Sequence, residues 1–221
     1  MQDFTEEQIK EVAAQLRKPS GDNGKEIGKL MNVGNATMNL HTLAILNPQS
    51  NDSILEIGMG NGFFVKNILN LDPSITYTGC DYSELMIQES IGNNQSYIDS
   101  KRASFIHGEI EKLPFDSKTF NKAFTINTMY FWENPKKALF ELNRILKTDG
   151  QLIIAIRPKH NIENFPMGKY GFTKYECEDV IQLLEDNHFT NFNVTEIKEP
   201  ENNGWGDNQK RESLIISARK N

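Results

Sequence analysis

Three glycines at alternate positions directly follow a short apolar segment, and this spacing restricts the fold more than any other feature of the chain. The segment Ile54-Leu55-Glu56-Ile57 has the character of a strand, Gly58-x-Gly60-x-Gly62 follows it, and a helical pattern begins at Phe63. Glycine tolerates positive φ and lets a ligand lie against bare backbone. Free N–H groups at the start of the next helix suit an anionic group. The loop therefore predicts a site for a nucleoside cofactor at the carboxyl end of a strand.

Strand and helix patterns alternate along the rest of the chain. Strands are expected at 53–57, 75–80, 104–107, 122–126 and 151–156, and helices at 63–71, 83–91 and from Asn134 to about 148. Continuous apolar runs such as 152–156 are typical of a parallel sheet that is covered on both faces. A helix over 174–187, opened by Thr173, precedes two closing strands near 192–197 and 212–218, joined by a polar loop with Gly204-Trp205-Gly206. We predict an α/β, doubly wound Rossmann-like fold whose mostly parallel seven-stranded sheet ends in an antiparallel hairpin.

The first 48 residues have helical patterns only. Thr5-Glu6-Glu7-Gln8 fits a capping box, and an apolar stripe follows it. The segment 19–24 predicts a break, and a second helical region runs from 26 to 46 with Gly34 as a point of interruption. We predict an N-terminal helical cap over 1–48 and a ligand-binding domain over 49–221.

Composition excludes several classes of function. The 221 residues carry a net charge of −6 and no run of Lys or Arg, which disfavours nucleic acid as the main partner. No stretch approaches the roughly 20 apolar residues of a membrane span, and the N-terminus has no secretory pattern, so we expect a cytoplasmic protein without membrane contact. Cys80 and Cys177 are too few for a disulfide framework or a thiolate zinc site. We expect no metal.

Acidic residues around the glycine loop discriminate between possible cofactors. The nicotinamide fingerprint G-x-G-x-x-G would place its third glycine at Phe63, which is not a glycine. Glu56 stands two residues before the first glycine, where a carboxylate suits a cationic group. Asp81 ends the next strand, where it can accept hydrogen bonds from two ribose hydroxyls, although this feature is shared with nicotinamide enzymes. The spacing disfavours a nicotinamide-dependent oxidoreductase but leaves it as an alternative.

Together these segments resemble the class I S-adenosylmethionine-dependent methyltransferases, and especially the small-molecule branch similar to the ubiquinone/menaquinone-biosynthesis enzymes. The likeness is carried by Ile54-Leu55-Glu56-Ile57-Gly58-Met59-Gly60-Asn61-Gly62, by 77–86 with Gly79-Cys80-Asp81-Tyr82, by 107–115 with Gly108-Glu109-Ile110 followed by 120–124, and by 142–152 with Thr148-Asp149-Gly150. The resemblance implies S-adenosylmethionine as the cofactor. It implies contacts from Glu56, Gly58, Gly60, Gly62, Asp81, Tyr82, Met86, Glu109, Ile110 and Asn127, with Asp81 on the ribose, Glu109 and Ile110 at the adenine, and Asn127 at the methionine part.

Methyl transfer places modest chemical demands on the protein, because the sulfonium is already activated and alignment supplies much of the rate. Tyr130 and Trp132 follow the fourth strand, where they can line the site of a small-molecule acceptor or contact the sulfonium. Arg157 follows the fifth strand and can hold an acidic group of the substrate. His160 is the candidate general base, and Tyr130 is a second catalytic candidate. A binding protein for S-adenosylmethionine without catalysis is the non-enzymatic alternative.

Overall fold

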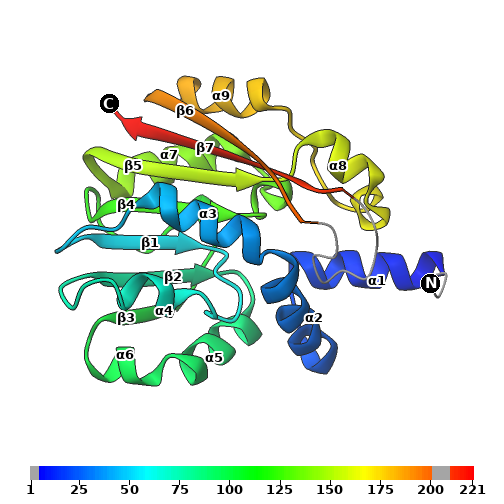
Figure 1. The fold of residues 1–221 in the computed structure, drawn as a ribbon, viewed down its shortest axis with the longest axis horizontal. Helices are drawn as coiled ribbons and strands as arrows, with labels where there is room; N and C mark the ends of the chain where they lie inside the picture. The colour runs from blue at the N-terminus through cyan, green and yellow to red at the C-terminus, as the bar shows by residue number, and fades with distance from the viewer. Residues whose placement is uncertain (1–4, 201–209) are drawn as a thin grey trace.

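A seven-stranded sheet forms the centre of the computed structural model, which describes residues 5–200 and 210–221 (Figure 1). The strands are β1 (Ser53–Ile57), β2 (Thr76–Asp81), β3 (Ala103–His107), β4 (Phe120–Ile126), β5 (Leu146–Ile156), β6 (Phe189–Lys198) and β7 (Glu212–Lys220). Their order is β3-β2-β1-β4-β5-β7-β6, parallel from β3 to β5, with β7 antiparallel to both of its neighbours. The predicted fold is confirmed, while the loop with Gly204-Trp205-Gly206 lies outside the described residues.

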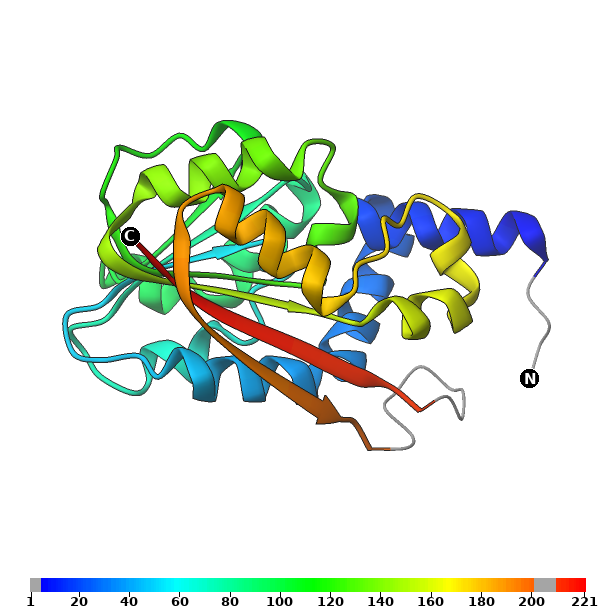
Figure 2. The same ribbon diagram turned by 90° about the horizontal axis from the view of Figure 1, so that it is seen from above.

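Helices cover both faces of this sheet. The helices of the described residues are α1 (Glu6–Arg17), α2 (Gly21–Gly34), α3 (Ala36–Leu46), α4 (Val65–Leu69), α5 (Glu84–Asn93), α6 (Gln95–Asp99), α7 (Pro135–Ile145), α8 (Lys159–Asn164) and α9 (Cys177–Asp186), with short 3₁₀ turns η1 (Ile110–Lys112), η2 (Met129–Phe131) and η3 (Pro166–Lys169). Figure 2 shows α7 and α9 on one side of the sheet and α3 on the other. Because side chains alternate along a strand, Ile154 packs in the core with α7 and Ile153 in the core with α3. Both faces of β5 are therefore buried, as its apolar run predicts.

The N-terminal helices differ from their predicted bounds. Helix α2 begins at Gly21 rather than at 26, because Gly24 serves packing instead of breaking the chain: a Cβ there would lie 2.9 Å from the Leu85 side chain of α5. The second helical region is interrupted, with Asn35 standing between α2 and α3. Helix α3 buries Met38 against the sheet. A boundary at residue 48 thus falls between α3 and the strands with which α3 shares a core. The division of the chain into two domains stays a prediction.

The C-terminal third also contains elements that the sequence patterns missed. Helix α8 and the turn η3 lie between β5 and α9, where the sequence patterns predict neither helix nor strand. Helix α9 begins at Cys177 instead of 174, because Glu176 and Asp179 form its capping box. The backbone N–H of Thr173, the predicted cap, donates instead to the carbonyl of Tyr130 at 3.0 Å. This contact draws the segment after η3 toward the carboxyl end of β4.

The start of helix α7 gives a testable contribution to stability. The side chain of Asn134 accepts a hydrogen bond from the backbone N–H of Lys137 at 3.0 Å, and Pro135 occupies the first helical position. We expect Asn134→Ala to lower the free energy of unfolding by about 1 kcal/mol, since the first turn then lacks its cap. Urea denaturation measures this loss. Asn134→Ser, which keeps a capping oxygen, should retain most of the stability, and equal losses in both variants would contradict the capping role.

The parallel strands all point their carboxyl ends toward α1 and α2 (Figure 1). Strand β1 lies between β2 and β4. After β1 the chain forms β2 and β3 on one side of it and then crosses to form β4 on the other side. This reversal is the switch point at which open α/β sheets bind ligands. The fold therefore brings the glycine loop and the N-terminal helices to the same end of the sheet.

Candidate functional site

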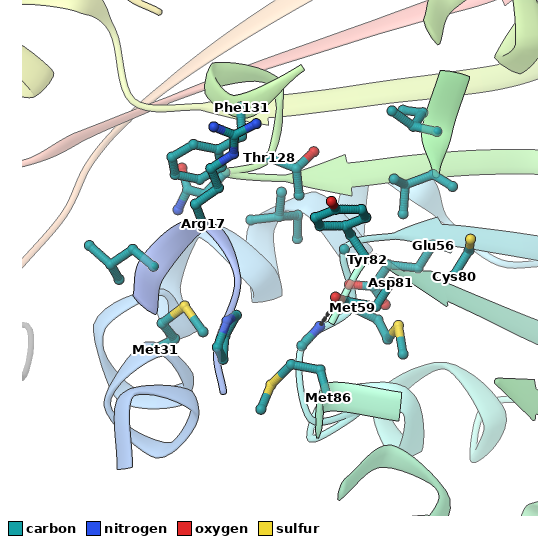
Figure 3. A pocket seen from close by; sticks show the side chains of 18 of the residues that line it. Arg17, Met31, Glu56, Met59, Cys80, Asp81, Tyr82, Met86, Thr128 and Phe131 are labelled. Atoms are coloured by element: carbon teal, nitrogen blue, oxygen red, sulfur yellow. Dashed lines mark hydrogen bonds between the residues drawn. The ribbon is translucent and has the colours of Figure 1, made fainter. Parts of the chain in front are cut away.

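A cavity of about 310 Å³ lies at the carboxyl ends of β1, β2 and β4, with walls from α1 and α2 (Figure 3). Nine of the ten residues predicted to contact a cofactor line it: Glu56, Gly58, Gly60, Asp81, Tyr82, Met86, Glu109, Ile110 and Asn127. Trp132, predicted for the substrate, lines the same cavity. The volume is within the usual range of small-molecule sites.

The glycines of the loop have two different roles. Gly58 and Gly60 both have positive φ, 70° and 59°, and line the cavity. Gly62 does not line it. Its carbonyl accepts a hydrogen bond from Asn94 Nδ2 at 3.1 Å, and a Cβ there would lie 2.7 Å from that nitrogen. Gly62 therefore allows the loop to pack on α5, while the first two glycines leave backbone open to a ligand.

Asp81 ties the glycine loop to the end of β2. Its carboxylate accepts hydrogen bonds from the backbone N–H of Gly60 at 3.1 Å and of Ser83 at 2.8 Å. Burial raises the pKa of Asp81 from 3.8 to about 6, and these two backbone hydrogen bonds oppose the rise. The half-exposed ring of Tyr82 follows, with the Lys18 ammonium 4.0 Å from its centroid. A carboxylate and an aromatic ring thus stand together on the cavity wall.

Glu56 is a second buried carboxyl group in this wall. Only 5% of the residue is exposed, and the hydroxyl of Tyr77 donates to it at 2.6 Å. Burial raises the pKa of Glu56 from 4.5 to about 7; the Tyr77 hydrogen bond opposes this rise, and the charge of Asp81 adds to it. A cation in the cavity would favour the ionised form of Glu56.

These shifts predict how stability depends on pH in the ligand-free protein. Both folded pKa values lie above the unfolded ones, so the contribution is present at low pH. It is lost as the pH rises through about 6 for Asp81 and about 7 for Glu56. We expect wild type to lose stability relative to Glu56→Gln as the pH rises from 4.5 to about 7, by at most about 3 kcal/mol in total. Urea denaturation at a series of pH values measures the difference, and a difference independent of pH would contradict the assignment.

A second, smaller cavity of about 60 Å³ adjoins the first. Leu16, Met31, Asn35, Asn127 and Phe131 line both cavities and form the boundary between them. Tyr130 and Arg157, which the sequence predicts as substrate-binding residues, line the second cavity. The two spaces therefore meet at Asn127, where β4 ends.

Tyr130 is held in place by hydrogen bonds at this boundary. Its hydroxyl donates to Asn127 Oδ1 at 3.0 Å and accepts from the backbone N–H of Arg157. Burial raises the pKa of Tyr130 well above its ordinary value. Asn127 Nδ2 in turn donates to Asn35 Oδ1 at 3.1 Å, which connects the end of β4 to the N-terminal helices. The Tyr130 hydroxyl is thus a positioned hydrogen-bonding group that keeps its proton.

Arg157 and His160 both have acidic partners inside the protein. Arg157 Nη1 lies 2.6 Å from Glu199 Oε1, and the side chain of Glu199 is fully buried. His160 Nε2 lies 3.1 Å from Glu212 Oε2, and about half of the imidazole is exposed. His160, the predicted general base, lines neither of the two cavities, so the structure does not bring it together with the other site residues.

The N-terminal helices supply a further part of the site. Leu16, Arg17, Met31 and Asn35 line the first cavity from α1, α2 and the residue after α2. The segment 17–21 with Met31 and Asn35 resembles the N-terminal region of some methyltransferases whose N-terminal helices cover the cofactor, but this likeness assigns no role to the individual side chains. Within residues 5–200 and 210–221, no cluster of three or more His, Cys, Asp or Glu side chains is placed to hold a metal ion. No helix in these ranges combines the length and apolar character needed to cross a bilayer.

Comparison with known proteins identifies the family. A family model described as a methyltransferase domain matches residues 55–154. The Bacillus subtilis protein named "Putative methyltransferase YrhH" is 32% identical over 146 residues, covering 66% of this chain and 73% of that protein. The chain belongs to the class I S-adenosylmethionine-dependent methyltransferases. A second Bacillus subtilis relative, "Uncharacterized methyltransferase YdaC", is 28% identical over 132 residues, or 60% of this methyltransferase and 71% of the relative.

Solved structures show the same fold. A structure described as a complex between the Haloferax volcanii Trm112 methyltransferase activator and "the putative methyltransferase" has a TM-score of 0.74 at 18% identity, and the match covers 95% of this methyltransferase and 97% of the other chain. A Thermotoga maritima SAM-dependent methyltransferase has a TM-score of 0.67 at 22% identity, with 89% and 96% covered. The first of these comparisons extends over nearly the whole chain.

Proposed function

We propose that this methyltransferase binds S-adenosylmethionine in the 310 Å³ cavity and transfers its methyl group to a small molecule in the adjoining cavity. The observation that carries the proposal is the shared boundary: Asn127 lines both cavities at the end of β4. In-line transfer requires donor and acceptor to meet at one point, and two adjoining cavities provide such a point.

The residues of the first cavity fit this cofactor. Five carboxyl side chains line it, those of Glu56, Asp81, Glu109, Glu111 and Glu133, against the single guanidinium of Arg17 among the described lining residues. An acidic wall suits a molecule with a sulfonium and an ammonium group. When bound, S-adenosylmethionine supplies a methyl group on an electrophilic sulfur. Glu56 is proposed as the buried partner of the ammonium, because two opposite charges attract each other more strongly in a buried site than in water.

Individual roles are proposed from the family resemblance, for residues that line the cavity wall. Asp81 is proposed to accept hydrogen bonds from the ribose hydroxyls, with Tyr82 and Met86 beside it. Glu109 and Ile110 are proposed to contact the adenine, and the backbone of Gly58 and Gly60, which carries no side chain, the central part of the cofactor. Asn127 is proposed to face the methionine end. Gly62 is not included, since it packs on α5.

Catalysis in this proposal rests on alignment and the exclusion of water. Trp132 and Phe131 cover the first cavity, and Tyr130 keeps the amide of Asn127 in one orientation through its 3.0 Å hydrogen bond. Tyr130 is therefore proposed as a positioning residue, and not as a proton acceptor. His160 has no role in the proposal, because it contributes to neither cavity wall.

Two measurements test the proposed function. The protein should gain thermal stability with S-adenosylhomocysteine and none with NADH, because ligand binding to the folded state raises its melting temperature. Stabilisation by NADH alone would favour the oxidoreductase alternative. Labelled methyl groups should then be transferred from S-adenosylmethionine to at least one member of a metabolite panel. Cofactor binding without transfer to any member would favour a non-catalytic binding protein.

A further inference from the structure

We propose that Asn39, in the first turn of helix α3, is a further cofactor-binding residue, and that its amide oxygen accepts a hydrogen bond from the ammonium group of S-adenosylmethionine beside Glu56. This inference rests on the proposed function, because it concerns the methionine end of the same cofactor site. It gives the helices that precede the sheet a direct part in holding the cofactor.

Asn39 is a buried side chain on the wall of the first cavity. Only 7% of the residue is exposed, and it lines the cavity together with Glu56 and Asn127. Its Nδ2 donates to the backbone carbonyl of Asn35 at 3.0 Å. Because a carbonyl oxygen can only accept, this hydrogen bond fixes the orientation of the amide and turns Oδ1 away from Asn35.

The amide oxygen of Asn39 receives no hydrogen bond from the described residues. It is not shut into the core either, since within residues 5–200 and 210–221 the Thr42 hydroxyl is the one side-chain polar group that is both enclosed and without a partner. The oxygen therefore faces the open space that Asn39 lines, which is the first cavity. A buried acceptor without a donor costs free energy, and a ligand that supplies the donor recovers it.

Asn35, which orients Asn39, is itself held at the end of the sheet. Its Oδ1 accepts a hydrogen bond from Asn127 Nδ2 at 3.1 Å, so the junction between α2 and α3 is tied to the end of β4. The carbonyl of Asn35 accepts from the backbone N–H of Asn39 at 2.9 Å as well as from its side chain. The free oxygen of Asn39 thus has a fixed place before a ligand binds, which reduces the entropy lost on binding.

Asn39 and Glu56 reach the cavity from the same face of the sheet. Side chains alternate along a strand, so Glu56 shares a face with Ile54, whose core includes Met38 of α3. Tyr77, which donates to Glu56, belongs to this same core. Helix α3 covers this face (Figure 2). One group therefore comes from the sheet and the other from the helix above it.

The order of the strands determines which part of the cofactor can reach Asn39. The adenine is proposed to lie after β3 and the ribose at the end of β2, whereas α3 packs against β4, β5 and β7, on the other side of β1. S-Adenosylmethionine carries hydrogen-bond donors on its adenine amino group, its ribose hydroxyls and its ammonium group, and only the ammonium belongs to the methionine end. An ammonium has three donor hydrogens and no acceptor, which suits a carboxylate and an amide oxygen together.

Calorimetry with S-adenosylhomocysteine and two of its analogues tests this inference. One analogue lacks the amino group of the amino-acid part, and the other lacks the carboxyl group. The measured quantity is the affinity for S-adenosylhomocysteine divided by that for the analogue without the amino group, because a general disturbance of the cavity weakens both ligands alike. Asn39→Ala should lower this ratio about tenfold, since a hydrogen bond from a charged group is lost. The ratio against the analogue without the carboxyl group should stay as in wild type.

Further variants separate the role of Asn39 from folding and from general charge. Asn39→Asp keeps the size of the side chain and places a negative charge beside the ammonium, so the first ratio should be at least as high as in wild type. This variant decides the question where Asn39→Ala does not fold. Asn67→Ala and Asn67→Asp, at an exposed position of α4 that lines neither cavity, should leave the ratio unchanged.

Three results would contradict the role of Asn39. They are an unchanged ratio in Asn39→Ala, a lowered ratio in Asn39→Asp, and a change confined to the ratio against the analogue without the carboxyl group. The last result would mean that the amide faces the carboxylate of the cofactor. Failure of S-adenosylhomocysteine to bind the wild-type protein would instead overturn the proposed function.

Discussion

Asp81→Ala is expected to weaken the binding of S-adenosylhomocysteine by about 100-fold or more, since two hydrogen bonds to a charged acceptor are lost at roughly 1.5–3 kcal/mol each. The loss of hydrogen bonds within the ligand-free protein adds to this effect. Asp81 accepts from Gly60 and Ser83, so its loss also releases the glycine loop from the end of β2. Isothermal calorimetry measures the change in affinity.

A matched control separates the loss of a carboxylate in the cavity from the general effect of removing one negative charge. Asp99→Ala removes an exposed carboxylate at the end of α6 that hydrogen-bonds only Gln95 among the partners identified for it, and it should leave affinity unchanged. Asp81→Asn should recover part of the loss, because an amide oxygen still accepts hydrogen bonds but carries no charge. If Asp81→Ala binds like wild type, the ribose lies elsewhere in the cavity.

Arg157→Met is expected to lower the free energy of unfolding by about 3–5 kcal/mol, because it leaves the Glu199 carboxylate buried without its partner. Adding Glu199→Gln should restore much of this loss, since the neutral amide keeps an oxygen for the Ser213 hydroxyl and no longer buries a charge. Urea denaturation of both variants at neutral pH measures the recovery.

The exposed pair between Arg17 and Glu133 is the control for this cycle. Its two atoms lie 3.1 Å apart, but the side chains are 44% and 81% exposed. Arg17→Met should therefore cost no more than about 1 kcal/mol. Equal losses in the Arg17 and Arg157 variants would mean that the buried pair is solvated in solution, and the wall of the second cavity would then lack its rigid support.

The sequence was sufficient for those parts of the site that short local patterns encode. The strand, loop and helix around Gly58 and Gly60 are contiguous, and Asp81 ends the next strand, so parallel pairing alone brings them together. Gly62 continues the same glycine spacing, yet it packs against Ser90 and Asn94. These two residues come from a distant segment of the chain, and they decide the role of Gly62. Pattern therefore predicts the loop without predicting which glycine meets a ligand.

The acceptor side could not be predicted in this way. Arg157 and Glu199 are 42 positions apart and meet only because β5 and the β6–β7 pair form one end of the sheet. Asn35 contacts Asn127 across 92 positions from the junction between α2 and α3. His160 was the best titratable candidate near β5, but α8 turns it toward Glu212. These contacts depend on how distant elements pack, which periodicity does not encode.

The position of β7 has a consequence for how the chain is made. This strand follows every other strand in the sequence, yet it lies between β5 and β6 in the sheet. While a ribosome is still adding residues before Glu212, β5 has an open edge of Ile153, Ile154 and Ile156, and β6 has no neighbour. Exposed apolar edges invite pairing with other chains. The sheet therefore cannot close between β5 and β6 until β7 has been made.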